Sequence, residues 1–280
     1  MLLICPVCSN PLHRELKSFR CDQGHSFDLA KEGYLNLLLS HQRRSSHPGD
    51  DEQMIQARRR FFDSGVFDPL MEQILAAFSC FDTAPFTLLD CGCGEGHSLG
   101  ALSDAYAGTF YGVDISKEAI RCAAKRYKKA NWMVANVMRS LPFANQSLDG
   151  ILSVLAPRNP VEFSRILKPD GVLVLGVPGL NHLIEVRTEL AENVPDFEEK
   201  ADEAVLRCQP YFTEIQRTAH RYERMLHRDQ LADLIKMTPI FWNSSPAAKA
   251  RILQCSELTV TFSWVLLSLK RCDPVQPDRG

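Results

Sequence analysis

The stretch Leu88-Leu89-Asp90-Cys91-Gly92-Cys93-Gly94-Glu95-Gly96-His97 decides the fold, because it joins a short apolar run to a helical pattern through a glycine-rich turn. Glycine lets the backbone turn tightly and approach a ligand closely. Loops that bind dinucleotides use similar glycines to place a pyrophosphate on the helix N-terminus. Here Asp90 precedes the loop and Glu95 lies within it, and both carboxylates would repel a pyrophosphate. The loop therefore favours a ligand that carries positive charge.

Apolar runs and helical patterns alternate on both sides of this stretch. Strands are predicted at residues 86–91, 109–114, 131–135, 148–154 and 171–177, with helices at 98–106, 116–128 and 161–167. Short, continuous apolar strands that alternate with helices predict a parallel sheet buried on both faces. Farther on, the pattern predicts a polar helical stretch at 180–206, a mixed segment near 211–226, a helix at 228–236 and a last strand at 257–270. We expect an α/β fold whose sheet is mostly parallel, with an antiparallel C-terminal strand.

The composition is that of an ordinary globular protein. The chain has 280 residues, of which 45% are hydrophobic and 24% charged, and its formal net charge is -2. These values exclude disordered and fibrous classes and a histone-like polycation. No apolar run approaches the roughly 18–20 residues of a membrane span. The N-terminus lacks the basic and hydrophobic regions of a signal peptide, so we expect a cytoplasmic protein without disulfides and without membrane contact.

Three of the ten cysteines have the spacing of a metal site. Cys5 and Cys8 form a C-x2-C knuckle, Cys21 follows after twelve residues, and His25 follows after three more. Two thiolates on one tight turn occupy one edge of a tetrahedron, and a second turn supplies the other edge, as in structural zinc sites. His13 is the competing fourth ligand, and reduced cysteines without a metal are the alternative. The expected structural Zn²⁺ would supply folding energy that this short segment lacks.

The segments before the glycine loop suggest a small module and a connector. Residues 1–37 are predicted to form the zinc-binding module, residues 38–84 a helical connector, and residues 85–280 the main domain. In the connector, helices are expected from Asp51 to about Ser64 and from Pro69 to Phe81. A basic cluster beside the module could contact RNA phosphates. Its members are Arg43, Arg44, Arg58, Arg59 and Arg60.

The residues from Leu89 to Gly96 resemble the first motif of class I S-adenosylmethionine-dependent methyltransferases, whose cofactor carries amino and sulfonium charges. The resemblance implies a Rossmann-like fold and S-adenosylmethionine as the cofactor. It further implies that Asp114, at the end of the second strand, accepts hydrogen bonds from both ribose hydroxyls, and that Asn136 lies against the adenine. The implied cofactor contacts in the glycine loop are Asp90, Gly92, Gly94, Gly96 and His97.

The whole chain resembles the bacterial 23S ribosomal RNA guanine-N1 methyltransferases of the RlmA/RrmA type. The spacing of Cys5, Cys8, Cys21 and His25, together with Pro48-Gly49-Asp50 and Met237-Thr238-Pro239, carries this resemblance outside the cofactor motifs. It implies methyl transfer to N1 of a guanine in a hairpin of 23S rRNA, recognition of that hairpin by the zinc module, and a homodimer. Matching to the family also implies cofactor contacts from Phe67 and His182.

The sequence after the fourth strand bears on the target atom. Enzymes that methylate exocyclic amines often have an Asn/Asp-Pro-Pro-aromatic motif there, whereas this chain has Ser153 to Pro160 in its place, which favours a ring nitrogen. No general base is identified, and Arg158 is a candidate for contacting guanine O6 or a phosphate. Two other functions stay open: a methyltransferase for a small molecule, which would not need the zinc module, and an inactive RNA-binding relative, which would not need an intact glycine loop.

Overall fold

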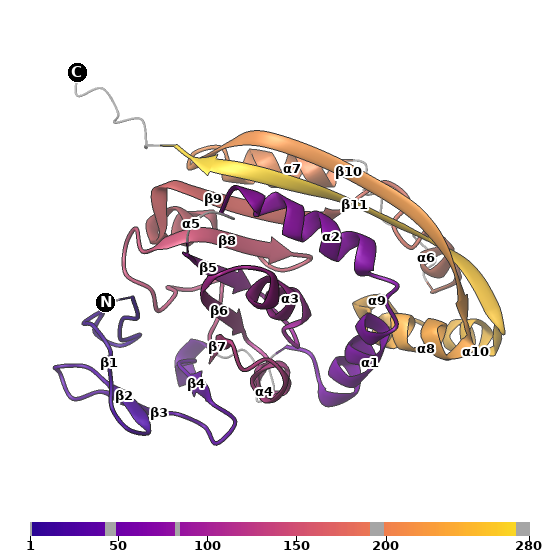
Figure 1. Cartoon of the computed structure of the whole chain (residues 1–280). Coiled ribbons are helices and arrows are strands. Elements are labelled where there is room, and N and C mark those ends of the chain that lie inside the picture. The colour runs from indigo at the N-terminus through magenta and orange to yellow at the C-terminus, as the bar shows by residue number, and fades with distance from the viewer. Residues whose placement is uncertain (1, 43–48, 82–84, 191–198, 273–280) are drawn as a thin grey trace.

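The computed structural model describes residues 2–42, 49–81, 85–190 and 199–272, and the side chains of residues 239 and 240 are outside this description (Figure 1). Its main element is an eight-stranded sheet in the order β10-β11-β9-β8-β5-β6-β7-β4. The strands are β4 (Tyr34–Asn36), β5 (Phe86–Cys91), β6 (Gly108–Asp114), β7 (Ala130–Val134), β8 (Leu148–Val154), β9 (Leu167–Pro178), β10 (Phe212–His227) and β11 (Glu257–Arg271). The strands from β4 to β9 are parallel, and β11 is antiparallel to both of its neighbours, β9 and β10. The predicted sheet is confirmed.

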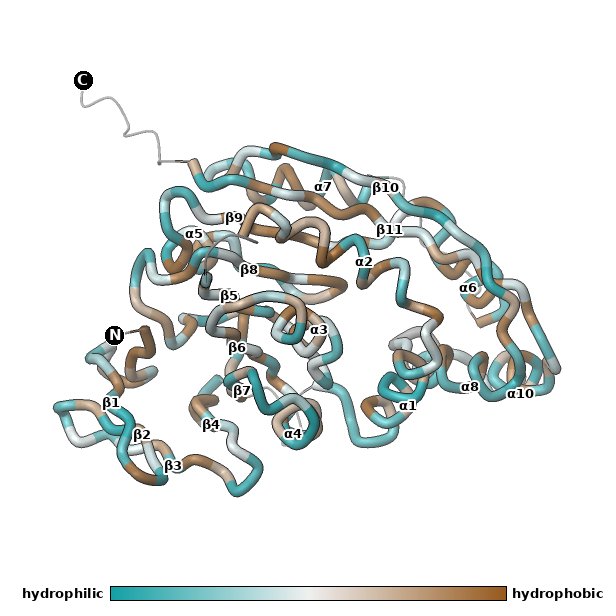
Figure 2. Tube along the Cα trace, in the orientation of Figure 1, coloured by the Kyte–Doolittle hydropathy of each residue, from teal (hydrophilic) through white to brown (hydrophobic). Residues whose placement is uncertain are grey.

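Helices cover both faces of the sheet, so the core has two layers. The first core contains side chains from α1 (Glu52–Asp63), α2 (Asp68–Ala77), α3 (His97–Ala105), α4 (Lys117–Arg126), α6 (Ile184–Leu190), α8 (Arg228–Lys236), α9 (Pro239–Asn243) and α10 (Pro246–Gln254). The second contains side chains from α5 (Pro160–Ile166), α7 (Lys200–Cys208) and the N-terminal segment. Figure 2 shows central β8 as mostly hydrophobic and α4 as mostly hydrophilic, as expected for an inner strand of a buried sheet and for a helix at the surface.

The N-terminal segment forms a small three-stranded antiparallel sheet of β1 (His13–Arg14), β2 (Ser18–Arg20) and β3 (Ser26–Asp28). It is joined to the main sheet at two places. Leu3 bridges to Phe143, and β4 pairs in parallel with β7 at the edge of the large sheet. The predicted boundary after residue 37 stays a prediction, since this strand belongs to both the predicted module and the main sheet.

The connector begins with a capped helix, as the sequence predicts. The Asp51 side chain accepts a hydrogen bond from the backbone N–H of Met54 and so caps α1. The second helix is shorter than predicted, since α2 ends at Ala77 and a 3₁₀ turn, η2 (Ser79–Phe81), follows; another, η1 (Ser40–Gln42), precedes α1. No helix in the described residues is long and apolar enough to cross a membrane.

The largest departure from the predicted elements is β10. The sequence indicated only a mixed segment near 211–226, but the structure has a sixteen-residue strand there that pairs along its whole length with β11. It is the edge strand of the sheet and most of its side chains are exposed or half-buried, so it lacks the apolar run that marks the inner strands. The predicted polar helical stretch is α6 and α7, with residues 191–198 outside the description.

Candidate active site and metal centre

The glycine loop turns between β5 and α3 at the carboxyl edge of the sheet. Gly92, Gly94 and Gly96 all have positive φ angles, of 79°, 54° and 89°. A Cβ atom on Gly92 would lie 2.4 Å from the Cβ of Ala156, in the loop after β8. A Cβ on Gly96 would lie 2.5 Å from the ring of Trp132 on β7. Glycine is therefore required both for the backbone conformation and for the close approach of neighbouring loops.

Replacing Gly92 with alanine is expected to lower the free energy of unfolding by about 2–4 kcal/mol, because it adds a left-handed strain and a steric clash. Thermal or denaturant unfolding measures this effect. Gly33→Ala is the matched control: Gly33 also has a positive φ, of 98°, but no atom lies within 4 Å of its would-be Cβ. The control should therefore show only the conformational cost. Equal losses for the two variants would contradict the role assigned to close packing.

Asp114 and Asn136 lie side by side at the ends of β6 and β7. Asp114 Oδ2 accepts a hydrogen bond from the backbone N–H of Gly94 at 2.9 Å, and Oδ1 accepts one from Ser116 at 2.8 Å. The backbone N–H of Ala135 donates to the Asp114 carbonyl at 3.0 Å, which places Asn136 next to this carboxylate. Burial raises the pKa of Asp114, although the two N–H donors oppose that shift. The carboxylate is thus fixed on the glycine loop.

Two more carboxyl groups are buried close to the loop. Burial, and then the nearby charge of Asp114, raises the pKa of Asp90 to about 8. The Glu95 side chain is 1% exposed, and its buried Oε1 has no hydrogen-bond partner among the described residues. Burial also raises the pKa of Glu95. Buried carboxyl groups at one loop suit a cationic ligand, because a cation favours their charged forms. Glu95 was not among the predicted cofactor contacts. Its position between Gly94 and Gly96 in the loop is the feature of the sequence that could have identified it.

His97 begins α3 and stacks on Phe62, with ring centroids 4.8 Å apart. Burial lowers the pKa of His97, and the charge of Arg126 adds to this shift. A neutral, packed imidazole at the start of α3 forms part of the wall next to the glycine loop.

Phe67 and His182 meet in one aromatic cluster. Phe67 has ring centroids 5.5 Å from Phe262 and 5.8 Å from Trp264, and His182 is 6.4 Å and 6.3 Å from the same two rings. Both residues are buried, at 3% and 6% exposure. The structure therefore brings together two predicted cofactor contacts that are more than a hundred residues apart in sequence.

The hydrogen bonds of His182 fix its chemical form. Its Nδ1 accepts a hydrogen bond from the backbone N–H of Ser263 at 3.2 Å, so the neutral ring carries its proton on Nε2. Burial, and then the charge of Arg187, lowers the pKa of His182 to about 4. At neutral pH this imidazole offers a donor and no available acceptor, and it is not suited to act as a general base.

The arginines predicted to contact RNA have acidic partners within the chain. Arg58 pairs with Asp50 at 2.5 Å, and Arg60 makes three hydrogen bonds to Asp233, at 3.2, 2.9 and 2.5 Å. The Arg58 guanidinium also lies next to Gly94, 3.2 Å from the position of a would-be Cβ. Arg59 is 3.9 Å from Asp63. Arg43 and Arg44 lie outside the described residues, so an RNA role for this cluster stays a prediction.

Arg158 lies in the loop after β8, at the same edge of the sheet as the glycine loop. Its side chain is half-buried, and burial lowers the pKa of its guanidinium, which still remains cationic at neutral pH. The preceding Ala156 lies against Gly92, as described above. Arg158 therefore belongs to a loop that is in contact with the cofactor loop.

The four predicted metal ligands converge in the N-terminal segment. The ligand atoms of Cys5, Cys8, Cys21 and His25 all lie within 4.8 Å of one another. Cys21 Sγ is 3.6 Å from Cys8 Sγ and 3.4 Å from His25 Nδ1. Burial alone would raise the pKa of Cys21, but hydrogen bonds with His25 and Cys8 lower it to about 6, toward the thiolate that binds metals. His13 pairs instead with Asp22, 3.5 Å away. Four soft or imidazole donors and no open position fit a structural zinc.

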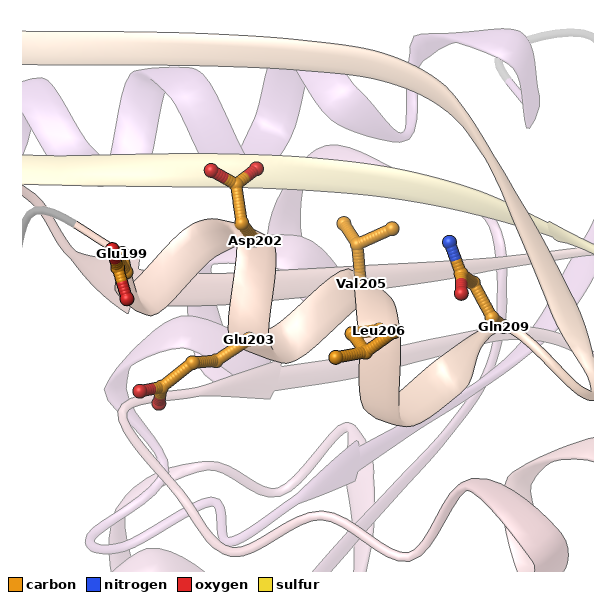
Figure 3. Close-up of a pocket in the computed structure, with 6 residues that line it drawn as sticks. All are labelled: Glu199, Asp202, Glu203, Val205, Leu206 and Gln209. Carbon is orange, nitrogen blue, oxygen red and sulfur yellow. The ribbon is translucent and has the colours of Figure 1, made fainter.

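A surface pocket lies along α7 (Figure 3). It is lined by Glu199, Asp202, Glu203, Val205, Leu206 and Gln209. Half of these side chains are acidic, and all six come from one helix or its ends. Two of the three carboxylates are paired with cations, Glu203 with Lys200 at 2.9 Å and Asp202 with Arg217 at 2.8 Å, and none of the predicted site residues lines this pocket.

The parallel sheet, the acidic glycine loop and the carboxylate at the end of β6 define a class I S-adenosylmethionine-dependent methyltransferase with a zinc-binding segment. Residues 89–175 match the family described as "Methyltransferase domain", and residues 3–46 match the zinc-ribbon family described as "RlmA, N-terminal". The crystal structure of the YcgJ protein from Bacillus subtilis has the same fold, with a TM-score of 0.50 and 18% identity; the match covers 72% of this chain and 99% of that one.

Curated relatives match nearly the whole chain. A Micromonospora griseorubida protein assigned as a 23S rRNA (guanine-N(1)-)-methyltransferase is 33% identical over 92% of this chain and 94% of its own. The 23S rRNA (guanine(748)-N(1))-methyltransferase of Streptomyces fradiae is 34% identical over 89% of each chain. The chain belongs to the family of 23S rRNA (guanine-N(1))-methyltransferases.

Proposed function

We propose that the protein transfers a methyl group from S-adenosylmethionine to N1 of a guanine in a hairpin of 23S rRNA. The observation that carries this proposal is the similarity to enzymes so named over about nine-tenths of the chain, which includes the zinc segment. The proposal includes a cytoplasmic location, because ribosomal RNA is found there. It also includes a homodimer. The family relation does not favour a small-molecule methyltransferase, and the intact glycine loop does not favour an inactive relative.

The cofactor would lie across the carboxyl ends of β5, β6 and β7. In this arrangement Asp114 would accept hydrogen bonds from the ribose hydroxyls and Asn136 would lie beside the adenine. The backbone at Gly92, Gly94 and Gly96 would hold the methionine part. Asp90 and Glu95 compensate the positive charges. Phe67 and the Nε2–H of His182 meet the methionine end, and His97 supports the loop. The buried Oε1 of Glu95 has no hydrogen-bond partner in the described residues, so it could accept a hydrogen bond from a bound ligand, while the charges of Arg126 and Arg58 also act on this carboxylate.

The chemistry needs a guanine N1 that has lost its proton. Bound S-adenosylmethionine supplies an electrophilic methyl group on a sulfonium. Deprotonation of guanine N1 moves negative charge toward O6, so a fixed cation near O6 would stabilise the reacting form. Arg158 is the proposed contact for O6 or for a phosphate beside it, since it lies in the loop next to Gly92. His182 would position the cofactor and would not accept the proton.

The direct test uses rRNA that lacks the modification. The purified protein is incubated with labelled methyl donor and unmodified 23S rRNA, and the labelled nucleotide is mapped and identified by mass spectrometry. The proposal expects 1-methylguanine in a hairpin loop. Label found only in small molecules of a cell extract would replace it with the small-molecule alternative, and donor binding without any transfer would favour the inactive relative.

The pKa of Asp90 predicts a pH dependence of cofactor binding. With a pKa of about 8, the carboxyl group is mostly protonated at pH 7, whereas a bound cation favours the ionised form. Binding of S-adenosylmethionine at pH 7 is therefore expected to release up to about one proton, and its affinity should rise with pH until about pH 8. Calorimetry in buffers of different ionisation enthalpy measures both effects. Asp90→Asn should remove most of this dependence; a wild-type affinity that stays flat from pH 6 to 8 would contradict it.

A further inference from the structure

The loop after β7 exposes two neighbouring side chains of different character. Met138 is 55% exposed, and Arg139 beside it is also exposed. They follow Asn136, the proposed adenine contact, by two and three residues. Arg139 forms no ion pair with any residue in the described ranges. A large apolar side chain and an arginine are thus both available to a partner at the cofactor edge of the sheet.

Asn159 ties this loop to the loop after β8. Its Nδ2 donates to the carbonyl oxygens of Val137, at 3.2 Å, and Arg139, at 3.4 Å. Its Oδ1 accepts from the backbone N–H of Glu162 at 3.4 Å and so caps α5. Arg158 directly precedes Asn159 and, within the part of the chain that the structure describes, has no ion pair either. The two arginines therefore lie in loops that one side chain holds together.

The loop after β8 carries a second exposed apolar side chain in a strained conformation. Leu155 has a φ of +51° and is 52% exposed, while its backbone N–H donates to the carbonyl of Gly176 at 2.9 Å. Left-handed backbone at a bulky residue is costly and collects at functional sites. We name the set Met138, Arg139, Leu155 and Arg158 the bridge surface.

The loop that carries Met138 and Arg139 is hydrogen-bonded, farther along, to the N-terminal end of the zinc module. Within the same loop, the carbonyl of Pro142 accepts from the backbone N–H of Ile4 at 3.0 Å, and the N–H of Ala144 donates to the carbonyl of Leu2 at 2.8 Å. Arg165 on α5 fixes the loop by donating to the carbonyl oxygens of two of its residues, at 2.9 and 2.7 Å. The path from the cofactor edge to the metal segment is thus a short, firmly held stretch of backbone.

The charges favour RNA on this side of the molecule. Arg58 and Arg60 on α1 are ion-paired with Asp50 and Asp233, whereas Arg139 and Arg158 form no ion pair in the described residues. The charge of Glu203 on α7 acts on Arg158 from a longer distance and is partly balanced there by Arg207. Unpaired nucleotides need cations for their phosphates and apolar or planar groups for their exposed bases. The bridge surface has two of each kind. Duplex RNA hides its bases, so exposed apolar side chains would add nothing to its binding.

We propose that the bridge surface binds the unpaired nucleotides next to the target guanine, with Arg139 and Arg158 on phosphates and Met138 and Leu155 against bases. It directs the RNA from the methyl-transfer edge to the zinc module. This inference rests on the proposed function, because it takes ribosomal RNA as the substrate, and it names the surface that the substrate occupies.

Arg139→Ala tests the inference without touching the proposed cofactor contacts. The affinity for an unmodified 23S rRNA transcript, measured against KCl concentration, is expected to fall by roughly 3–10-fold, and the slope of log K against log salt to become shallower by about 1. The affinity for S-adenosylmethionine and the zinc content should not change. Lys125→Ala is the matched control, since Lys125 is exposed in the last turn of α4, at the opposite edge of the sheet, and has no ion pair in the described residues.

The outcomes separate this inference from the function on which it rests. An Arg139→Ala protein with wild-type affinity and salt slope would overturn the inference, as would an equal loss in Lys125→Ala. Stronger competition by a duplex than by a single strand of the same length would also count against it. By contrast, a wild-type protein that binds the transcript but forms no 1-methylguanine would overturn the proposed function. In that case the effect of Arg139→Ala on RNA affinity would still decide whether the bridge surface binds RNA.

Discussion

Replacing Asp114 with asparagine is expected to weaken S-adenosylmethionine binding by about 100-fold or more. The carboxylate has two oxygens, each already held by one backbone N–H, and each still has a free lone pair for a ribose hydroxyl. A hydrogen bond to a charged group contributes about 1.5–3 kcal/mol, and 1.4 kcal/mol corresponds to tenfold in affinity. The asparagine amide would also point a donor at the N–H of Gly94 or Ser116. Titration calorimetry with the cofactor measures the loss.

Asp104→Asn is the control for this change. Asp104 lies at the C-terminal end of α3, the end farther from the glycine loop, and forms an exposed ion pair with Lys129 at 2.7 Å. Such surface pairs contribute little to stability, so the control should bind the cofactor like the wild type. An Asp114→Asn protein whose affinity stays within about threefold of the wild type would remove Asp114 from the cofactor site.

Replacing His25 with alanine is expected to lower zinc affinity by more than about 100-fold. Loss of a residue that only hydrogen-bonds to a metal ligand costs about 10–100-fold, and loss of the ligand itself should cost more. Because binding of a structural zinc is coupled to folding, loss of this ligand should also loosen the N-terminal segment. Competition with a chromophoric chelator gives the affinity, and limited proteolysis reports the loosening. RNA affinity should fall with it, since the bridge surface leads into this segment.

His13→Ala separates the two candidate fourth ligands. His13 is in the same segment but pairs with Asp22, so its removal should leave the zinc content unchanged. Zinc lost from His13→Ala and kept by His25→Ala would reverse the assignment of the fourth ligand.

The inner strands and the metal site could be predicted from the sequence because their signals are local. The apolar runs that became β5 and β8 match their predicted bounds, and the spacing from Cys5 to His25 is enough to bring four donors together. By contrast, the edge strand β10 has few buried side chains, and its place is set by pairing with β11, some forty residues away along the chain. A signal that depends on a distant partner is weak in the sequence alone.

The candidate site shows the same limit. The glycine loop and Asp114 follow from motif and position, but the partners of an arginine do not. The run from Arg58 to Arg60 indicated a basic cluster that could contact RNA, and the sequence did not indicate that Asp50 and Asp233 would pair with Arg58 and Arg60. Arg139 belongs to no sequence motif. Its connection to Arg158 depends on a tertiary contact, in which Asn159, the residue after Arg158, donates a hydrogen bond to the carbonyl oxygen of Arg139. A charge pattern in the sequence therefore identifies an RNA-binding surface only when the structure shows which of the charges form ion pairs.

The pairing of β4 with β7 has a consequence for how this protein can be divided. A short piece of the N-terminal segment closes one side of the parallel sheet (Figure 1). Cutting the chain after this strand would leave β7 as a bare edge, and bare edges of buried strands attract other chains and aggregate. A truncated enzyme should therefore precipitate even though every proposed cofactor contact is kept. The zinc-binding segment therefore cannot be exchanged between relatives as an independent domain. Substitutions in Tyr34–Asn36 should be accompanied by matching substitutions in β7, because the two strands pair.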